Sequence, residues 1–156
     1  ESEGRRIKRA VNIDMRSARF LDEEMLDRLM KIQILKPYLE EKLLEIKKYN
    51  EEHNIDPTSP VNGRKLTNLG TFRKYMELYL AQLPKVNKNL TLMVRQQDPT
   101  DKGIPLEVYA FSLDKNLSGY ENLQSDIFDH LLAVIPEFEL KVFQSVKGDD
   151  FFPNRV

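Results

Sequence analysis

Apolar and polar residues alternate near the start of the chain, in RIKRAVNIDM (6–15). Ile7, Val11, Ile13 and Met15 occupy every second position, with Arg9 as the exception, and the positions between them are mostly polar. A period of two is typical of a strand that has one face in solvent. We therefore expect the chain to open with a strand.

The next three segments have the period of an α-helix. Apolar residues recur every three or four positions from Asp22, a suitable N-cap, to about Leu35, then through PYLEEKLLEIKKYNEEH (37–53) and TNLGTFRKYMELYLAQLP (67–84). Pro37 can open the second helix because its fixed φ suits the first helical position, and Pro84 ends the third. The turn-forming residues of NIDPTSPVNGRK (54–65) predict a loop.

The second half of the chain returns to strand patterns. LTLMVRQQ (90–97) and IPLEVYAFSL (104–113) read as strands joined by a hairpin turn in DPTDKG (98–103). Ser118 and Glu121 form a capping box that predicts a helix start, and Pro136 ends that helix. ELKVFQS (139–145) is expected to form a last strand.

This order of elements predicts an α+β fold. It matches the ferredoxin-like βαββαβ arrangement, in which the helices lie on one face of an antiparallel sheet. We expect one domain over residues 1–148, with a helical insertion at about 37–65 in the first crossover and a flexible tail at 149–156. Such a sheet leaves its second face free of helices.

Several large apolar residues exceed what this core needs. Leu92, Val94, Leu106, Val108 and Ala110 would face the helices, which leaves aromatic residues on the other sheet face, and the apolar band of the last helix is wider than one sheet face covers. These positions form a candidate subunit-interface surface of Met93, Tyr109, Phe111, Phe128, Leu132, Ile135 and Phe143.

Two other interpretations of the sheet face stay open. The tail or the insertion could cover it, or it could stack RNA bases as RNA-recognition motifs do. IPLEVYAFSL lacks the glycine and the leading basic residue of the motif's third strand, and it carries Glu107 beside the aromatic residues.

The stretch LQSDIFDHLLAVIPEF (123–138) contains potential metal ligands or acid–base groups. On a helical projection, Asp126 and Asp129 fall on the polar side and His130 on the boundary of the apolar band. His53, the chain's other histidine, lies in the remote insertion. We expect no metal, cofactor or catalytic residue here.

Composition narrows the function classes further. The 24 basic and 25 acidic residues nearly cancel, so no overall field draws the chain onto a nucleic acid. The absence of cysteine excludes disulfides, thiolate zinc sites and thiol nucleophiles. No apolar run is long enough to span a bilayer, and ESEGRRIKR lacks a starting methionine and a signal peptide, which suggests a soluble piece of a longer protein.

The basic run GRRIKR has two interpretations. The simpler one is a solvated strand edge, and the other is a site for nucleic acid or anionic lipid.

Five segments carry a family resemblance. GRRIKRAVNIDMRSARFLD, TNLGTFRKYMELYL, TLMVRQ, GIPLEVYAFS and LQSDIFDHLLAVIPEFELKVFQS resemble, in order and spacing, the C-terminal cytoplasmic part of bacterial MscS-like miniconductance mechanosensitive channels of the YbdG type. The resemblance extends from Gly4 to about Gly148.

The resemblance implies a homo-oligomeric, typically heptameric channel of the bacterial inner membrane that opens under membrane tension and relieves osmotic downshock. This chain would lie on the cytoplasmic side, after upstream transmembrane helices, and assemble with its copies into a vestibule that filters solutes. It would not be an enzyme, and no nucleic-acid partner is expected. The insertion at 37–65 and the absence of an alternating strand after Ser145 depart from the smallest family members. Apart from the resemblance, a small-molecule-binding regulatory module on the same frame remains an alternative.

Overall fold

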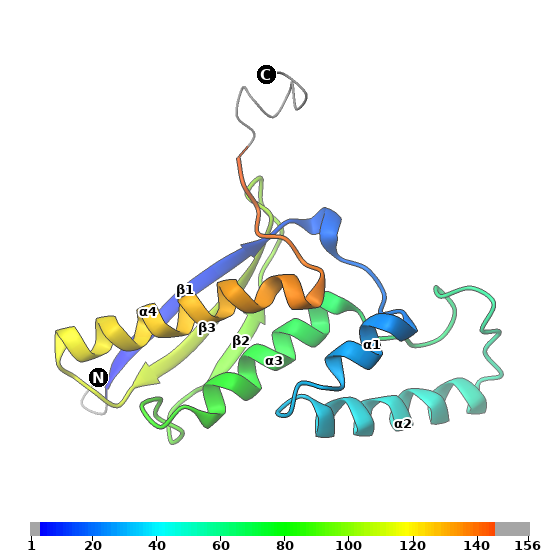
Figure 1. The fold of residues 1–156 in the computed structure, drawn as a ribbon, viewed down its shortest axis with the longest axis horizontal. Helices are drawn as coiled ribbons and strands as arrows, with labels where there is room; N and C mark the ends of the chain where they lie inside the picture. The colour runs from blue at the N-terminus through cyan, green and yellow to red at the C-terminus, as the bar shows by residue number, and fades with distance from the viewer. Residues whose placement is uncertain (1–3, 146–156) are drawn as a thin grey trace.

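The computed structural model describes residues 4–145, so the proposed tail at 149–156 lies outside the described part. These residues form an α+β fold that combines a three-stranded antiparallel sheet with four α-helices (Figure 1). In chain order the elements are β1 (Arg5–Ile13), the 3-10 helix η1 (Met15–Ser17), α1 (Glu23–Leu29), α2 (Lys36–Glu52), α3 (Asn68–Gln82), β2 (Met93–Gln96), β3 (Ile104–Ser112), α4 (Leu117–Val134) and the 3-10 helix η2 (Ile135–Phe138).

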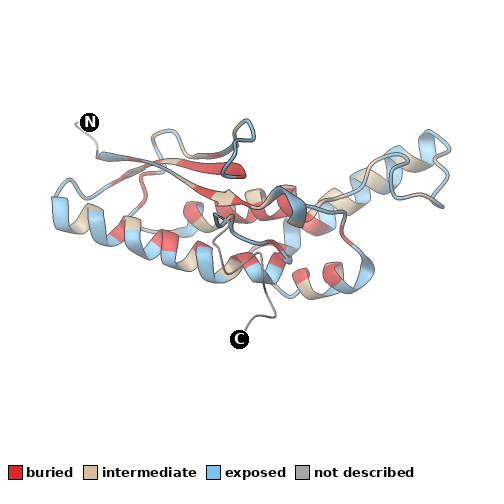
Figure 2. Cartoon of the chain, turned by 90° about the horizontal axis from the view of Figure 1, so that it is seen from above, coloured by how far each residue is buried: buried red, intermediate tan, exposed pale blue. Residues whose placement is uncertain are grey.

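The sheet has the order β1-β3-β2, with β3 antiparallel to both of its neighbours. Val108 lies opposite Arg9 on β1 and Val94 on β2, and Ala110 lies opposite Ile7. Directly opposite residues point to the same face, so the buried Ile7, Val94 and Ala110 share one side. Helices α3 and α4 cover this side, as Figure 2 shows, and the predicted inward face is confirmed.

The expected fourth strand does not form within the described residues. One isolated bridge joins Val142 to Ile13, beside two hydrogen bonds of 2.8 Å, from the Phe143 N–H to the Asn12 carbonyl and from the Asp14 N–H to the Lys141 carbonyl. These contacts involve only the C-terminal end of β1. A short apolar alternation predicts extended backbone, but it does not reveal how much of a partner edge the chain follows.

Helix starts follow their capping chemistry. The Asp22 carboxylate accepts the Met25 N–H at 2.8 Å, as predicted, although α1 ends at Leu29 and the chain makes a turn before α2. For α4 the capping-box prediction is wrong, because the N-cap is Asn116, whose side chain accepts the Ser118 N–H at 3.0 Å. Met15 also departs from prediction, since it lies in η1 and is 48% exposed.

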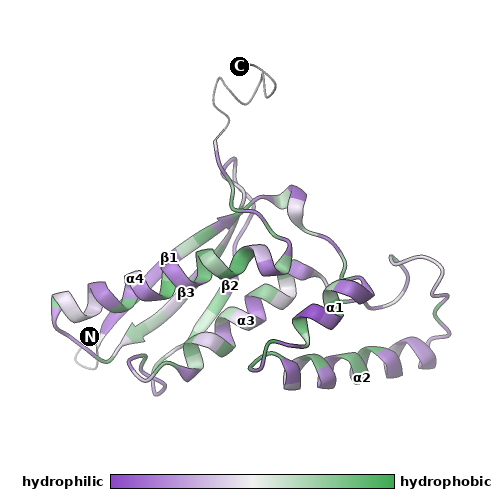
Figure 3. Ribbon diagram, viewed as in Figure 1, coloured by the Kyte–Doolittle hydropathy of each residue, from purple (hydrophilic) through white to green (hydrophobic). Residues whose placement is uncertain are grey.

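The predicted insertion, comprising most of α2 and the loop after it, projects from the rest of the fold (Figure 1). Leu39 is the buried residue of α2, whereas Leu44 is 70% exposed, and Figure 3 shows that most of this helix is hydrophilic. Asn50 ties the loop back to α2, because its side chain accepts the Arg64 N–H at 2.9 Å and donates to the Arg64 carbonyl at 3.0 Å. The insertion is therefore anchored mainly at its base.

Candidate assembly surface

One face of the sheet carries aromatic residues and no helix. Tyr109 lies in the middle strand opposite Met93 on β2 and Lys8 on β1, and Phe111 lies opposite Arg6. All of these side chains point away from α3 and α4, because each lies one position from a buried inward-facing residue. We call Met93, Tyr109 and Phe111 the sheet-face cluster, with Arg6 and Lys8 at its border.

The rings of the sheet-face cluster are ordered by contacts within the sheet. Tyr109 and Phe111 meet edge to face, with their ring centroids 5.8 Å apart and an interplanar angle of 83°. The Arg95 guanidinium lies 5.8 Å from the centre of the Tyr109 ring and forms an ion pair with Glu107. Met93, Tyr109 and Phe111 are half-buried, so their outward surfaces stay accessible.

Glu107 is only 7% exposed although no helix lies above it. It sits beside Arg95 on β2 and Ala10 on β1, and the Arg95 side chain supplies the opposite charge. A buried carboxylate needs such a partner, because loss of one member leaves an uncompensated charge. Glu107, the acidic residue by which this strand differs from an RNA-recognition motif, therefore has its negative charge balanced by Arg95.

The predicted interface residues of the last helix separate into two groups. Phe128 and Ile135 are 2% and 1% exposed, so they belong to the core of the chain. The Arg9 guanidinium lies 4.4 Å from the centre of the Phe128 ring, on the helix-covered side of the sheet. Leu132 is 45% exposed and is the member of the three that offers surface to a partner.

A second apolar patch lies where the fourth strand was expected. Leu132 and the half-buried Phe143 line one hollow of about 360 Å³ beside β1, together with Val142, which is 37% exposed. We call Leu132, Val142 and Phe143 the edge patch. It lies along β1, the strand at the edge of the sheet, and it is distinct from the sheet-face cluster.

His130 takes part in helix packing. Its Nε2 lies 2.6 Å from the Tyr75 hydroxyl, and its ring stacks on Tyr79 with centroids 4.0 Å apart. Burial lowers the pKa of His130 and raises the pKa of both tyrosines, to which Asp126 adds a further increase at Tyr79. The histidine turns toward α3 and forms no ion pair with Asp126.

Asp126 and Asp129 are exposed, as the sequence predicts. Among residues 4–145, no group of three or more histidine, cysteine or carboxylate side chains is placed to hold a metal ion. The geometry of this stretch therefore supports packing between α3 and α4.

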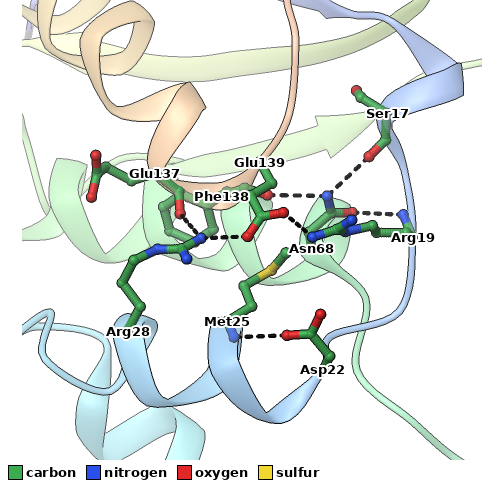
Figure 4. A network of polar contacts seen from close by, with 9 residues as sticks. All are labelled: Ser17, Arg19, Asp22, Met25, Arg28, Asn68, Glu137, Phe138 and Glu139. Atoms are coloured by element: carbon green, nitrogen blue, oxygen red, sulfur yellow. Dashed lines mark hydrogen bonds and ion pairs between the residues drawn. The ribbon is translucent and has the colours of Figure 1, made fainter.

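Asn68 joins three segments that are distant in sequence, as Figure 4 shows. The side chain is fully buried, donates to the carbonyls of Ser17 and Phe138 at 3.0 Å each, and accepts the Arg19 N–H at 2.9 Å. No pattern in the sequence distinguishes Asn68 as a structural residue. It is a polar residue directly after the helix N-cap, and polar residues are common at that position.

Glu139 completes this polar network. It has a left-handed backbone with φ of 54°, and its carboxylate pairs with Arg19 and Arg28 (Figure 4). Arg28 also donates to the Glu137 carbonyl at 3.1 Å. These contacts join α1 to the end of α4, and the turn at Glu139 leads the chain toward the end of β1.

A larger hollow adjoins the same turn. It has a volume of about 690 Å³ and is lined by apolar residues such as Leu132 and Ile135 together with Arg19, Glu139 and Lys141. Small-molecule sites commonly enclose about 300–1,000 Å³ with a few polar groups on an apolar lining. This hollow is the place where a small-molecule-binding module would hold its ligand.

Among the described residues, no helix is both long enough and apolar enough to cross a bilayer. The chain matches no protein-family model.

Proposed function

We propose that this chain assembles with copies of itself as the cytoplasmic vestibule domain of an MscS-like mechanosensitive channel. The sheet-face cluster is the observation that carries the assembly role. Aromatic side chains on a sheet face without a helix are typical of surfaces that bind other proteins, because their burial removes apolar area from water. The channel itself is inferred from the sequence resemblance.

The segments that carry the resemblance fall on the elements that frame this surface. GRRIKRAVNIDM contains β1, TLMVRQ contains β2 and GIPLEVYAFS contains β3, while TNLGTFRKYMELYL and LQSDIFDHLLAVIPEF supply the two covering helices. The order β1-β3-β2 agrees with a ferredoxin-like frame whose fourth strand would occupy the outer edge of β1, next to Val142. We propose that this edge is completed in the assembled protein.

The experiment is sedimentation velocity on the chain over a range of concentrations. We expect reversible self-association that weakens about tenfold or more in Phe111→Glu, since a charge placed in an apolar contact cannot be desolvated cheaply. Leu44→Glu is the matched control, because Leu44 is exposed on α2, away from the sheet. Circular dichroism verifies that both variants fold. Equal association of the two variants would contradict a role for the sheet face.

The two alternatives predict different results. An RNA platform requires binding of single-stranded RNA that weakens with salt and disappears in Tyr109→Ala, because stacking on an aromatic ring carries such binding. The observation that favours an RNA platform is the presence of the basic residues Arg6 and Lys8 at the border of the sheet-face cluster. A small-molecule module requires saturable ligand-induced stabilisation of the monomer that is lost when the hollow near Glu139 is altered.

A further inference from the structure

The arginines of β1 differ from all others in the described residues. Every arginine between 10 and 145 forms an ion pair with a carboxylate. Arg5, Arg6 and Arg9 form no such pair within residues 4–145. Arg9 is directed to the Phe128 ring, whereas Arg5 and Arg6 are exposed at the beginning of the strand. Within residues 4–145, the positive charge at this end of the sheet therefore has no ion-pair partner.

A hollow of about 410 Å³ lies at this end. It is lined by Gly4, Arg5, Arg6, Lys115 and Tyr120, so its three charged residues are all cationic. Lys115 comes from the segment between β3 and α4, and within the described residues it too has no ion-pair partner. Two separate parts of the chain thus line one hollow with like charges, whose mutual repulsion a bound anion would relieve.

Local contacts hold the beginning of β1 in place. The Tyr120 hydroxyl donates to the Arg6 carbonyl at 2.8 Å, and the Arg5 guanidinium lies 5.5 Å from the centre of the Tyr120 ring. A Cβ at Gly4 would lie 1.8 Å from the Ser112 carbonyl oxygen, so the backbone packs directly against the end of β3. The positions from which the two guanidinium groups extend are therefore fixed before any ligand arrives.

Among the described residues, the acidic side chain nearest to Lys115 along the chain forms a local hydrogen bond. Asp114 precedes Lys115, and its carboxylate accepts the Asn116 N–H at 2.8 Å in the turn that caps α4. It does not line the hollow. Among the described residues that line it, the hollow therefore presents guanidinium and ammonium donors and no carboxylate.

We propose that this hollow binds a phosphate group through Arg5, Arg6 and Lys115. A planar guanidinium can donate two parallel hydrogen bonds to phosphate oxygens, and an ammonium adds a mobile third donor. The ligand is either free inorganic phosphate or the headgroup of an anionic phospholipid, because both present the same tetrahedral anion. Arg6 also borders the sheet-face cluster, but the inference does not require self-assembly and goes beyond the proposed assembly role.

The first test is a titration of the chain with inorganic phosphate in low-salt chloride buffer, followed by amide NMR shifts. We expect saturable shifts centred on Arg5, Arg6 and Lys115. The triple variant Arg5→Gln/Arg6→Gln/Lys115→Gln should bind about tenfold more weakly or worse, since each charged hydrogen bond contributes strongly to affinity. The control Lys31→Gln/Lys36→Gln/Lys47→Gln removes the same charge from exposed positions elsewhere.

The second test identifies the source of the phosphate group. The same proteins are sedimented with vesicles of phosphatidylglycerol or of phosphatidylcholine. Binding to phosphatidylglycerol that is lost in the β1 triple variant assigns the site to a lipid headgroup, whereas saturable binding of inorganic phosphate without vesicle binding assigns it to the free ion. The proposal is overturned if neither probe binds, or if the control variant loses as much binding as the β1 variant.

Arg5 contacts Tyr120, so its loss could disturb the start of β1. Arg6→Gln alone is the second variant, because Arg6 accepts the Tyr120 hydrogen bond with its backbone carbonyl, which the substitution keeps. It should fold as the wild type does, by circular dichroism and thermal unfolding, and bind phosphate several-fold more weakly. Unchanged phosphate affinity in a folded Arg6→Gln would also overturn the site.

Discussion

The Tyr75 hydroxyl lies 2.6 Å from Nε2 of His130, which joins α3 to α4 through one polar contact beside the core. Tyr79 stacks on the other side of this contact, with its ring centroid 4.0 Å from that of the histidine. When the neutral imidazole carries its proton on Nδ1, its Nε2 accepts a hydrogen bond from the Tyr75 hydroxyl. One of the chain's two histidines is therefore part of the helix interface.

This contact predicts a pH dependence of stability. Burial lowers the pKa of His130, so below about pH 6.5 the unfolded chain binds more protons than the folded chain. The stabilisation is fully present above the unfolded pKa and is lost as the pH falls through it toward the folded pKa. Urea unfolding of the wild type should become easier over this range, and His130→Gln should show a weaker pH dependence.

His53→Gln is the control for the pH experiment. His53 is exposed at the end of α2, where its Nδ1 lies 2.9 Å from the Tyr49 carbonyl. Its removal should leave the difference between high and low pH as in the wild type. If His130→Gln and the wild type lose stability equally with acid, burial of His130 does not control its protonation.

Asn68→Ala should be strongly destabilising. The substitution leaves the Ser17 and Phe138 carbonyls and the Arg19 N–H without their partner. An unsatisfied buried polar group costs about 1–3 kcal/mol, and only the contact to Phe138 is fully buried, since water can reach the other two groups. We therefore expect the free energy of unfolding to fall by about 2–4 kcal/mol in urea melts. Asn62→Ala removes an exposed side-chain hydrogen bond to the Asp56 carbonyl and should cost less than about 1 kcal/mol. Similar losses in both variants would refute the role of Asn68.

Phe128→Ala and Leu132→Ala test whether, of these two predicted interface residues, Phe128 belongs to the core and Leu132 to the surface. Phe128 is 2% exposed, and its truncation should lower the free energy of unfolding by about 3–5 kcal/mol through lost burial and a cavity. Leu132 is 45% exposed, so its truncation should change stability by roughly 0.5 kcal/mol or less. Guanidinium unfolding of the two variants measures the difference. Equal losses would place Leu132 in the core as well.

Survival of osmotic downshock tests the channel proposal in cells. The variants are introduced into the complete gene that encodes this chain, in a bacterial strain without other mechanosensitive channels. We expect Phe111→Glu to reduce survival and the control Leu44→Glu to retain it, because only the former alters the sheet-face cluster. Tyr109→Ser serves as a second, milder change of the same surface. Full rescue by both sheet-face variants, at normal protein levels, would contradict the proposed role of this face.

Local chemistry determined most of the elements and the inward face of the sheet. Asp22 and Pro37 act within one helical turn, and the alternation in IPLEVYAFSL assigns Leu106, Val108 and Ala110 to the covered side regardless of the rest of the fold. Such signals depend on neighbours one to four positions away, so they can be read from the sequence. The outward position of Tyr109 and Phe111 follows from the same alternation.

Contacts between distant segments were decided only by the tertiary structure. Within residues 4–145, the fourth strand is reduced to the bridge at Val142, because the hydrogen bonds of this segment reach only the end of β1. Phe128 is buried in the core, where Arg9, an exception in the alternating pattern of β1, lies over its ring. Asn68 and His130 acquire their roles from partners more than 45 positions away, for which a periodic pattern carries no signal. Periodicity fixes which way a side chain points on its own element, whereas the partner it meets depends on how the elements pack.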